Sequence, residues 1–213
     1  WNFLNNSPQI ADDMGHGTHV AGIIASNWDE LGVAGVTAPQ IRIMPLKVLN
    51  KKVDGFVYKG QLITNVMAKA LRFARKNGAD VVNMSLGWPA FVQNPNFIRE
   101  VKETLKAGIP IIVAAGNNRK NVPTYPCSMQ GVICVGAIDH QGQMAQFSNY
   151  GGKVDLLAPG ENIVSLYPQN LESRRLRIQG HEMKKGSSQA APFVAGVAAT
   201  LKLLHPDIGL GEL

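Results

Sequence analysis

The sequence has few cysteines, few aromatic residues and no long uncharged apolar run. Two cysteines, Cys127 and Cys134, occur in 213 residues, and two thiols do not make a structural zinc site by themselves. No uncharged apolar stretch reaches the roughly 18 residues of a membrane-spanning helix, so we predict no membrane span. Aromatic residues form 7% of the chain and are not interleaved with the basic ones. Surfaces that bind nucleic acids combine aromatic and basic residues, so we predict no nucleic-acid partner.

Acidic residues are fewer than basic ones. The 15 acidic and 21 basic residues give a formal net charge of +6. The basic residues are scattered along the chain, which is typical of a solvated surface. An apolar content of 45% with 17% charged residues indicates a folded globular protein. The length suits one domain, and we predict a single domain over residues 1–213.

The most informative stretch is a pair of hydroxyls that precedes a run of small and apolar residues. Ser187 and Ser188 follow a glycine, and the residues from there to Leu204 are typical of a buried helix. A serine in the first turn of such a helix lies among unpaired N–H groups at the positive end of the helix dipole, which favours negative charge on a nearby oxygen. An ordinary N-cap serine is the alternative interpretation.

Two further motifs give this stretch a chemical context. The chain reads G-H-G-T-H-V-A-G at residues 15–22, V-A-A-G-N at residues 113–117 and G-S-S-Q-A-A-P at residues 186–192. Together the three closely resemble the subtilisin-like serine protease (subtilase, peptidase S8) family, whose blocks read H-G-T-H-V-A-G, A-A-G-N and G-T-S-x-A-x-P. Ser187 stands where the family usually has threonine. The resemblance runs nearly end to end, in the same order.

The resemblance implies a serine endopeptidase that works through an acyl-enzyme intermediate. A serine hydroxyl is a weak nucleophile unless a base takes its proton. The nucleophile would be Ser188 and the base His16, with His19 structural. The oxyanion of acyl transfer needs preorganised donors, which the Asn117 side chain and the Ser188 N–H would supply.

The same resemblance implies a substrate pocket. Two short segments would line the pocket for the residue before the scissile bond, and the first would also hold a polypeptide substrate as an added strand. Both walls are small and apolar, so we expect a preference for hydrophobic side chains. The predicted substrate-binding residues are Ser85, Leu86, Gly87, Ala114, Ala115 and Gly116.

The third member of the expected triad is not visible in the sequence. The family carries an aspartate on a strand ahead of the histidine, and no such strand precedes His16. Asp12 and Asp13 lie too close to it in sequence, and we interpret them as charges near a helix N-terminus. The resemblance then implies a partial catalytic domain, with the aspartate upstream of residue 1 or on a separate N-terminal chain.

A calcium site and secretion are also implied by the resemblance. The loop at residues 27–33 has the length of the family's strong calcium-site loop, where a hard cation takes carboxylate and carbonyl oxygens. The expected ligands are Asn27, Asp29, Leu31 and Val33. The resemblance to this family also implies a secreted or extracytoplasmic protein. Cys127 and Cys134 would form a disulfide in an oxidising compartment, and two buried free thiols are the alternative.

The coarse pattern indicates an α/β fold. Short apolar stretches alternate with segments of helical periodicity, which predicts a mostly parallel sheet with helices on both faces. The resemblance implies the three-layer subtilisin-like version of this architecture. Helices are expected at residues 18–26, 60–77, 95–107 and after 188, and strands at residues 41–49, 81–85, 109–115, 132–137, 154–160 and 163–165.

Two other functions compete with the endopeptidase. One is a non-catalytic subtilase-like domain that binds peptides or partners, and the presence of Ser188, His16 and Asn117 argues against it. The other is an α/β-hydrolase esterase. It is disfavoured because no G-x-S-x-G elbow occurs and the histidine precedes the serine.

Overall fold

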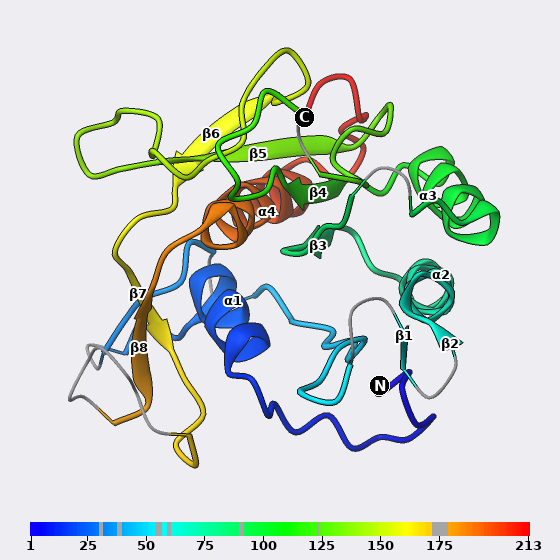
Figure 1. Cartoon of the computed structure of the whole chain (residues 1–213), viewed down its shortest axis with the longest axis horizontal. Helices are drawn as coiled ribbons and strands as arrows, with labels where there is room; N and C mark the ends of the chain where they lie inside the picture. The colour runs from blue at the N-terminus through cyan, green and yellow to red at the C-terminus, as the bar shows by residue number, and fades with distance from the viewer. Residues whose placement is uncertain are drawn as a thin grey trace.

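The fold is built on a parallel sheet in the order β3-β4-β5-β6 (Figure 1). The computed structural model describes residues 1–29, 32–37, 40–53, 57–58, 61–89, 92–122, 124–171 and 179–213. In the described residues the strands span Val82–Met84 (β3), Ile111–Ala114 (β4), Ile133–Ile138 (β5) and Leu156–Pro159 (β6).

The central strand β4 is apolar on both faces because both faces are covered. Its residues are all buried. Successive side chains point to opposite sides of a strand. Ile111 and Val113 accordingly join one hydrophobic core, and Ile112 and Ala114 join the other. The continuous apolar run that predicted this strand is therefore what a sheet between two helical layers requires.

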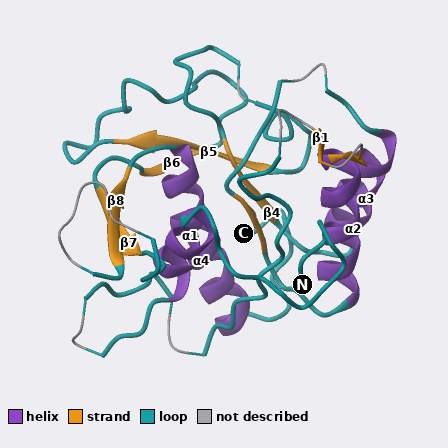
Figure 2. Ribbon diagram, turned by 60° about the horizontal axis from the view of Figure 1, so that its bottom comes forward, coloured by secondary structure: helices purple, strands orange, loops and turns teal. Residues whose placement is uncertain are grey.

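Helices form the outer layers. The pair α2 and α3 covers one face of the sheet, and α4 covers the other with α1 packed beside it (Figure 2). The Asn94 side chain accepts the N–H of Phe97 at 3.1 Å and starts α3, with Pro95 in the first turn. The expected α/β architecture, a mostly parallel sheet with helices on both faces, is confirmed. The helices span His16–Ala25 (α1), Ile63–Lys76 (α2), Pro95–Lys106 (α3) and Ser187–Leu204 (α4).

An antiparallel hairpin flanks α1. It pairs β7 (Ile163–Leu166) with β8 (His181–Lys184). The Ser165 hydroxyl donates to the carbonyl of His19 at 2.8 Å, which holds the hairpin against the helix. The predicted strand at 163–165 is confirmed, whereas β8 was not predicted. A short antiparallel pair, β1 (Val57–Tyr58) with β2 (Gln61–Leu62), precedes α2.

The strand predicted at residues 41–49 is wrong. The segment is irregular, and its pairing in the described residues is a single bridge between Lys47 and Asn2. A strand exists only where a neighbour completes its backbone hydrogen bonds. The side chains of residues 42–45 are exposed, so the apolar character of this segment does not reflect burial in a sheet.

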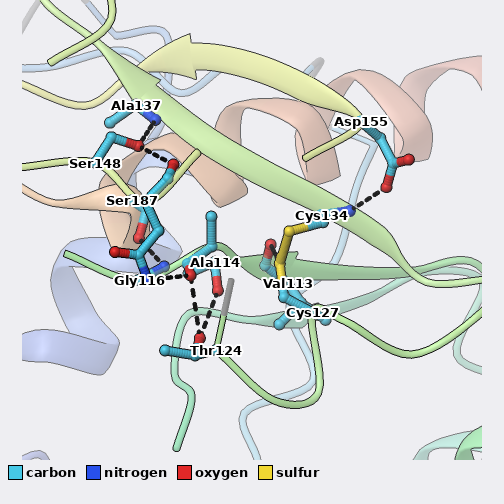
Figure 3. Close-up of a disulfide and its surroundings, with 12 residues drawn as sticks. Val113, Ala114, Gly116, Thr124, Cys127, Cys134, Ala137, Ser148, Asp155 and Ser187 are labelled. Atoms are coloured by element: carbon cyan, nitrogen blue, oxygen red, sulfur yellow. Dashed lines mark hydrogen bonds between the residues drawn. A yellow bond between two sulfur atoms is a disulfide. The ribbon is translucent and has the colours of Figure 1, made fainter. Parts of the chain in front are cut away.

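The two cysteines are bonded to each other. A disulfide joins Cys127 to Cys134, which lies in β5 (Figure 3). The bond settles the alternative between a disulfide and free thiols. It fixes the segment that follows Tyr125 to the sheet beside β4. Within the part of the chain that the structure describes, no helix is long and apolar enough to cross a membrane.

Candidate active site

The start of α1 positions His16. Gly15, just before the helix, has φ 72, and the Tyr167 ring packs so closely on it that a Cβ there would overlap the ring. Asp12 accepts hydrogen bonds from the backbone N–H groups of Met14 and Thr18 at 3.0 and 2.8 Å. Burial would raise the pKa of Asp12, but these bonds hold it below its usual value. Asp12 therefore places its charge at the N-terminus of the helix, as the sequence interpretation proposed.

His16 is suited to accept a proton. The ring is half-buried, and its pKa is lowered first by desolvation and then by the positive charge of Lys184, while Asp12 acts in the opposite direction. The imidazole is therefore neutral at neutral pH. Asp13 is paired with Lys47. Among the described residues, no carboxylate forms a hydrogen bond to the His16 ring.

His19 joins the helix to the hairpin. The ring is fully buried, and its Nε2 lies 3.2 Å from the carbonyl oxygen of Ile163 and 3.1 Å from that of Glu182. Desolvation lowers the pKa of His19 to about 4. A neutral ring with its proton on Nε2 donates to these carbonyls, which gives His19 a structural role.

Ser188 lies in the first turn of α4, against the segment that follows β3. Its hydroxyl donates to the carbonyl of Ser85 at 3.1 Å, and the Ser85 hydroxyl donates to the carbonyl of Ser188 at 2.7 Å. No hydrogen bond joins His16 to Ser188 in this structure, although α1 packs on α4. The hydroxyl must rotate from Ser85 to reach the base. Catalytic hydrogen bonds are often absent before substrate binds.

The Asn117 side chain is oriented by Ser187. Its oxygen accepts the backbone N–H of Ser187 at 2.8 Å and the Ser187 hydroxyl at 3.0 Å. The Ser187 hydroxyl in turn accepts the N–H of Gly116 at 2.9 Å. Because two donors occupy the amide oxygen, the NH2 group faces elsewhere. A Cβ at Gly186 would lie 3.2 Å from that nitrogen, so the glycine keeps the space beside it open.

Asn149 holds the Asn117 loop and was not found by sequence reasoning. Its side-chain oxygen accepts the N–H groups of Asn118 and Lys120 at 2.9 and 3.1 Å. Its NH2 donates to the carbonyl of Ala115 at 3.0 Å. Asn149 is buried. The only signal in the sequence is a polar pair with Ser148 in a segment that otherwise reads as a loop.

The two predicted pocket walls lie side by side. They follow β3 and end β4, which run parallel with Met84 opposite Val113. The carboxyl ends of parallel strands meet at one edge of a sheet, where ligands bind. Ser85, Ala114 and Ala115 are buried. The sheet thus brings the predicted pocket residues (Ser85, Leu86, Gly87, Ala114, Ala115, Gly116) to the same edge as Asn117 and Ser188.

The predicted calcium loop is described in part. Leu31 lies outside the described residues. Asn27 and Asp29 are exposed and Val33 is half-buried. The described residues contain no cluster of three or more histidine, cysteine or acidic side chains that could hold a metal. Asp29 is therefore the single predicted side-chain ligand, and the remaining oxygens would be carbonyls.

Comparison with known proteins gives consistent matches over nearly the whole chain. A family model described as the subtilase family matches residues 1–211. Subtilisin DY of Bacillus licheniformis is 33% identical over 215 residues, which covers 99% of this chain and 72% of that protein. A thermostable alkaline protease of Halalkalibacterium halodurans is 36% identical over 205 residues, which covers 96% of this chain and 52% of that protein.

Solved structures show the same likeness. The crystal structure of a cold-adapted subtilisin-like serine proteinase superposes with a TM-score of 0.80 at 28% identity. That match covers 100% of this chain and 70% of the other. The chain therefore spans about half to seven tenths of the proteins that it matches.

Proposed function

The chain belongs to the subtilase family of serine endopeptidases, and we propose that it hydrolyses polypeptides with Ser188 as nucleophile, His16 as general base and Asn117 as oxyanion donor. One observation carries this assignment. The Ser188 hydroxyl, in the first turn of α4, is within hydrogen-bond distance of the end of β3, and the Asn117 oxygen is already occupied by Ser187. The Asn117 NH2 thereby remains available to a substrate oxygen.

The reaction follows from these positions. The Ser188 oxygen forms a bond to the scissile carbonyl carbon while His16 takes its proton. The carbonyl oxygen becomes an oxyanion that accepts hydrogen bonds from the Asn117 NH2 and the Ser188 N–H at the start of α4. His16 then gives the proton to the leaving amine, and water repeats the sequence on the acyl-enzyme. Within residues 1–213, desolvation and the charge of Lys184 lower the pKa of His16, which favours the unprotonated ring that the first step needs.

A carboxylate from outside residues 1–213 completes the triad in this proposal. It would come from an upstream segment or from a separate chain. Asp12 is bonded to Thr18 and Asp13 to Lys47, so neither is placed to support the His16 ring. Without such a carboxylate the imidazole tautomer is unsupported, and we expect kcat to fall about 10⁴-fold. Comparing residues 1–213 alone with the protein that includes the missing segment measures this loss.

The substrate backbone pairs with residues 85–87 in the manner of an added strand. Ser85 holds that segment against Ser188 through two hydrogen bonds. The side chain before the scissile bond then enters between residues 85–87 and residues 114–116. This arrangement places the scissile carbonyl beside the nucleophile.

Calcium binding at residues 27–33 is a further part of the proposal. The ends of the loop are held together, since the Trp28 indole N–H donates to the carbonyl of Gly35 at 2.9 Å and the N–H of Gly35 donates to that of Ser26 at 3.0 Å. Asn27, Asp29, Leu31 and Val33 would supply oxygens to the ion. Calcium should raise the melting temperature of the wild type but not of Asp29→Asn. An equal rise in both would contradict this site.

We also propose that the protein is secreted or otherwise extracytoplasmic. The Cys127–Cys134 disulfide supports this location, because such bonds persist in oxidising compartments. Thiol titration of protein isolated without reductant from its natural location measures the state of the pair. Free thiols in that material would contradict the proposal.

Labelling with a fluorophosphonate probe tests the catalytic assignment. The probe reacts with an activated serine, and we expect the modified peptide to contain Ser188. Ser188→Ala should abolish labelling, and His16→Ala should slow it. The test uses residues 1–213 alone and together with the aspartate-bearing segment that this proposal requires. A folded protein that is labelled in neither case would favour the non-catalytic, peptide-binding function instead.

A further inference from the structure

We propose that Thr124 restricts the residue before the scissile bond to small side chains. This inference rests on the proposed function and concerns the specificity of the same site. It narrows the broad hydrophobic preference that the small, apolar walls predict. The restriction arises at two glycines, one in each wall, and at the side chain that contacts both.

Thr124 lies between the two walls. A Cβ built at Gly87 would overlap Thr124 Oγ1 and would lie 2.9 Å from Thr124 Cβ. A Cβ built at Gly116 would lie 2.7 Å from Thr124 Cγ2. Gly87 belongs to the wall that follows β3, and Gly116 to the wall that ends β4. The side chain of Thr124 therefore occupies space that borders both walls at the positions where neither wall has a side chain.

Hydrogen bonds keep Thr124 in this place. Its backbone N–H donates to the carbonyl of Ala115 at 2.8 Å. Its hydroxyl donates a hydrogen bond that is shared between two carbonyl oxygens, that of Ala115 at 3.3 Å and that of Ala114 at 3.4 Å (Figure 3). The threonine side chain is branched at Cβ and has restricted χ1 rotation. A substrate side chain cannot displace it without breaking these contacts with the wall.

Two anchors on the C-terminal side of Thr124 hold the segment that follows it. Tyr125 and Trp88 exchange two backbone hydrogen bonds of 2.8 Å, which ties the segment to the wall that follows β3. Cys127 is bonded to Cys134 in β5, which ties it to the sheet. Thr124 is therefore followed directly by residues that are anchored to this wall and to the sheet.

The consequence is a short pocket. Glycine, alanine or serine before the scissile bond needs little depth, whereas leucine, phenylalanine or tyrosine would meet the Thr124 methyl and hydroxyl groups. Pocket fit of this kind discriminates by about 10–200-fold per small change in size. We expect the wild type to bind peptides with alanine before the scissile bond at least about 10-fold more tightly than peptides with phenylalanine there.

Binding to inactive variants tests the proposal without requiring catalysis. Dissociation constants are measured for two peptides that differ by alanine or phenylalanine before the scissile bond. The proteins are Ser188→Ala and the same variant with Thr124→Gly. We expect Thr124→Gly to shift the ratio of the two constants toward phenylalanine by about 10–200-fold. Thr124→Val, which keeps the branched shape, is the matched control and should leave the ratio unchanged.

An unchanged ratio in the Thr124→Gly variant overturns the proposal, as does tighter binding of the phenylalanine peptide than of the alanine peptide by the Ser188→Ala protein. Absence of binding by both peptides to both variants overturns it too. Fluorophosphonate labelling of Ser188 is measured separately in the wild type and in Thr124→Gly. Loss of labelling in the wild type would contradict the catalytic assignment, whereas the binding ratio alone decides the role of Thr124.

Discussion

Pro192 leaves the carbonyl of Ser188 without its α-helical partner, because the residue four positions later has no backbone N–H. The Ser85 hydroxyl takes that place and donates to the carbonyl at 2.7 Å. The Ser188 hydroxyl returns a bond to the carbonyl of Ser85 at 3.1 Å. The proline in the first part of α4 thus creates an acceptor that ties the candidate nucleophile to the carboxyl end of β3.

Ser85→Ala should destabilise the protein and slow Ser188 labelling. The change leaves the half-buried Ser188 carbonyl without this donor, and we expect a loss of up to about 1 kcal/mol, the low end for an unpaired acceptor. Urea unfolding measures the free energy of unfolding, and the rate of fluorophosphonate labelling measures the reactivity of Ser188. Ser7→Ala removes an exposed hydroxyl bond and serves as the control. Equal unfolding midpoints for both variants would show that the Ser85 hydrogen bond does not contribute to the stability of the protein.

Asn117→Asp should lower kcat by about 10²–10³-fold, the usual effect of removing one oxyanion donor. The carboxylate still accepts the bonds from Ser187, so the loop should keep its structure. It replaces the NH2 by an acceptor, which repels an oxyanion. Peptide hydrolysis gives kcat and KM, and circular dichroism checks the fold. A kcat close to the wild type would remove Asn117 from the mechanism.

In residues 1–213 without the triad carboxylate, the acid limb of kcat/KM should lie below the usual histidine range near pH 6.5, because a carboxylate beside the ring would raise the pKa of His16. Activity falls as pH drops through the pKa of His16, and burial and the charge of Lys184 both lower that pKa. Lys184→Met removes a positive charge, favours the imidazolium and should move the acid limb to higher pH. Lys185→Met is the neighbouring control. A limb that shifts equally in both variants would argue against a specific effect of Lys184.

His19 should make folding sensitive to acid. Its pKa is about 4 in the folded protein and near 6.5 in the unfolded chain, so the unfolded state binds more protons between these values. Stability therefore falls as pH drops below 6.5, by roughly 3 kcal/mol once pH is below 4. Urea unfolding at several pH values measures this. His19→Gln should flatten the dependence, whereas the exposed His140→Gln should not.

Much of the fold was predictable because helices and buried strands have local patterns. The apolar spacing of residues 60–77 predicted α2, and the uninterrupted apolar run of residues 109–115 predicted β4. Residues 41–49 have a similar apolar character but no ladder of partners in the described structure. The short polar segment of β8 was missed because its strand character comes from pairing with β7.

The sequence by itself determined the family, the candidate nucleophile and base, and the order of the helices and parallel strands, because these depend on residues that are close in the chain. Only the tertiary structure decided how the site is supported. Ser85 and Ser188 are 103 positions apart, and Asn117 is 70 positions from Ser187. The contact of Thr124 with glycines of both walls arises only when β3 and β4 lie side by side. Such contacts depend on packing between layers, which no local pattern records.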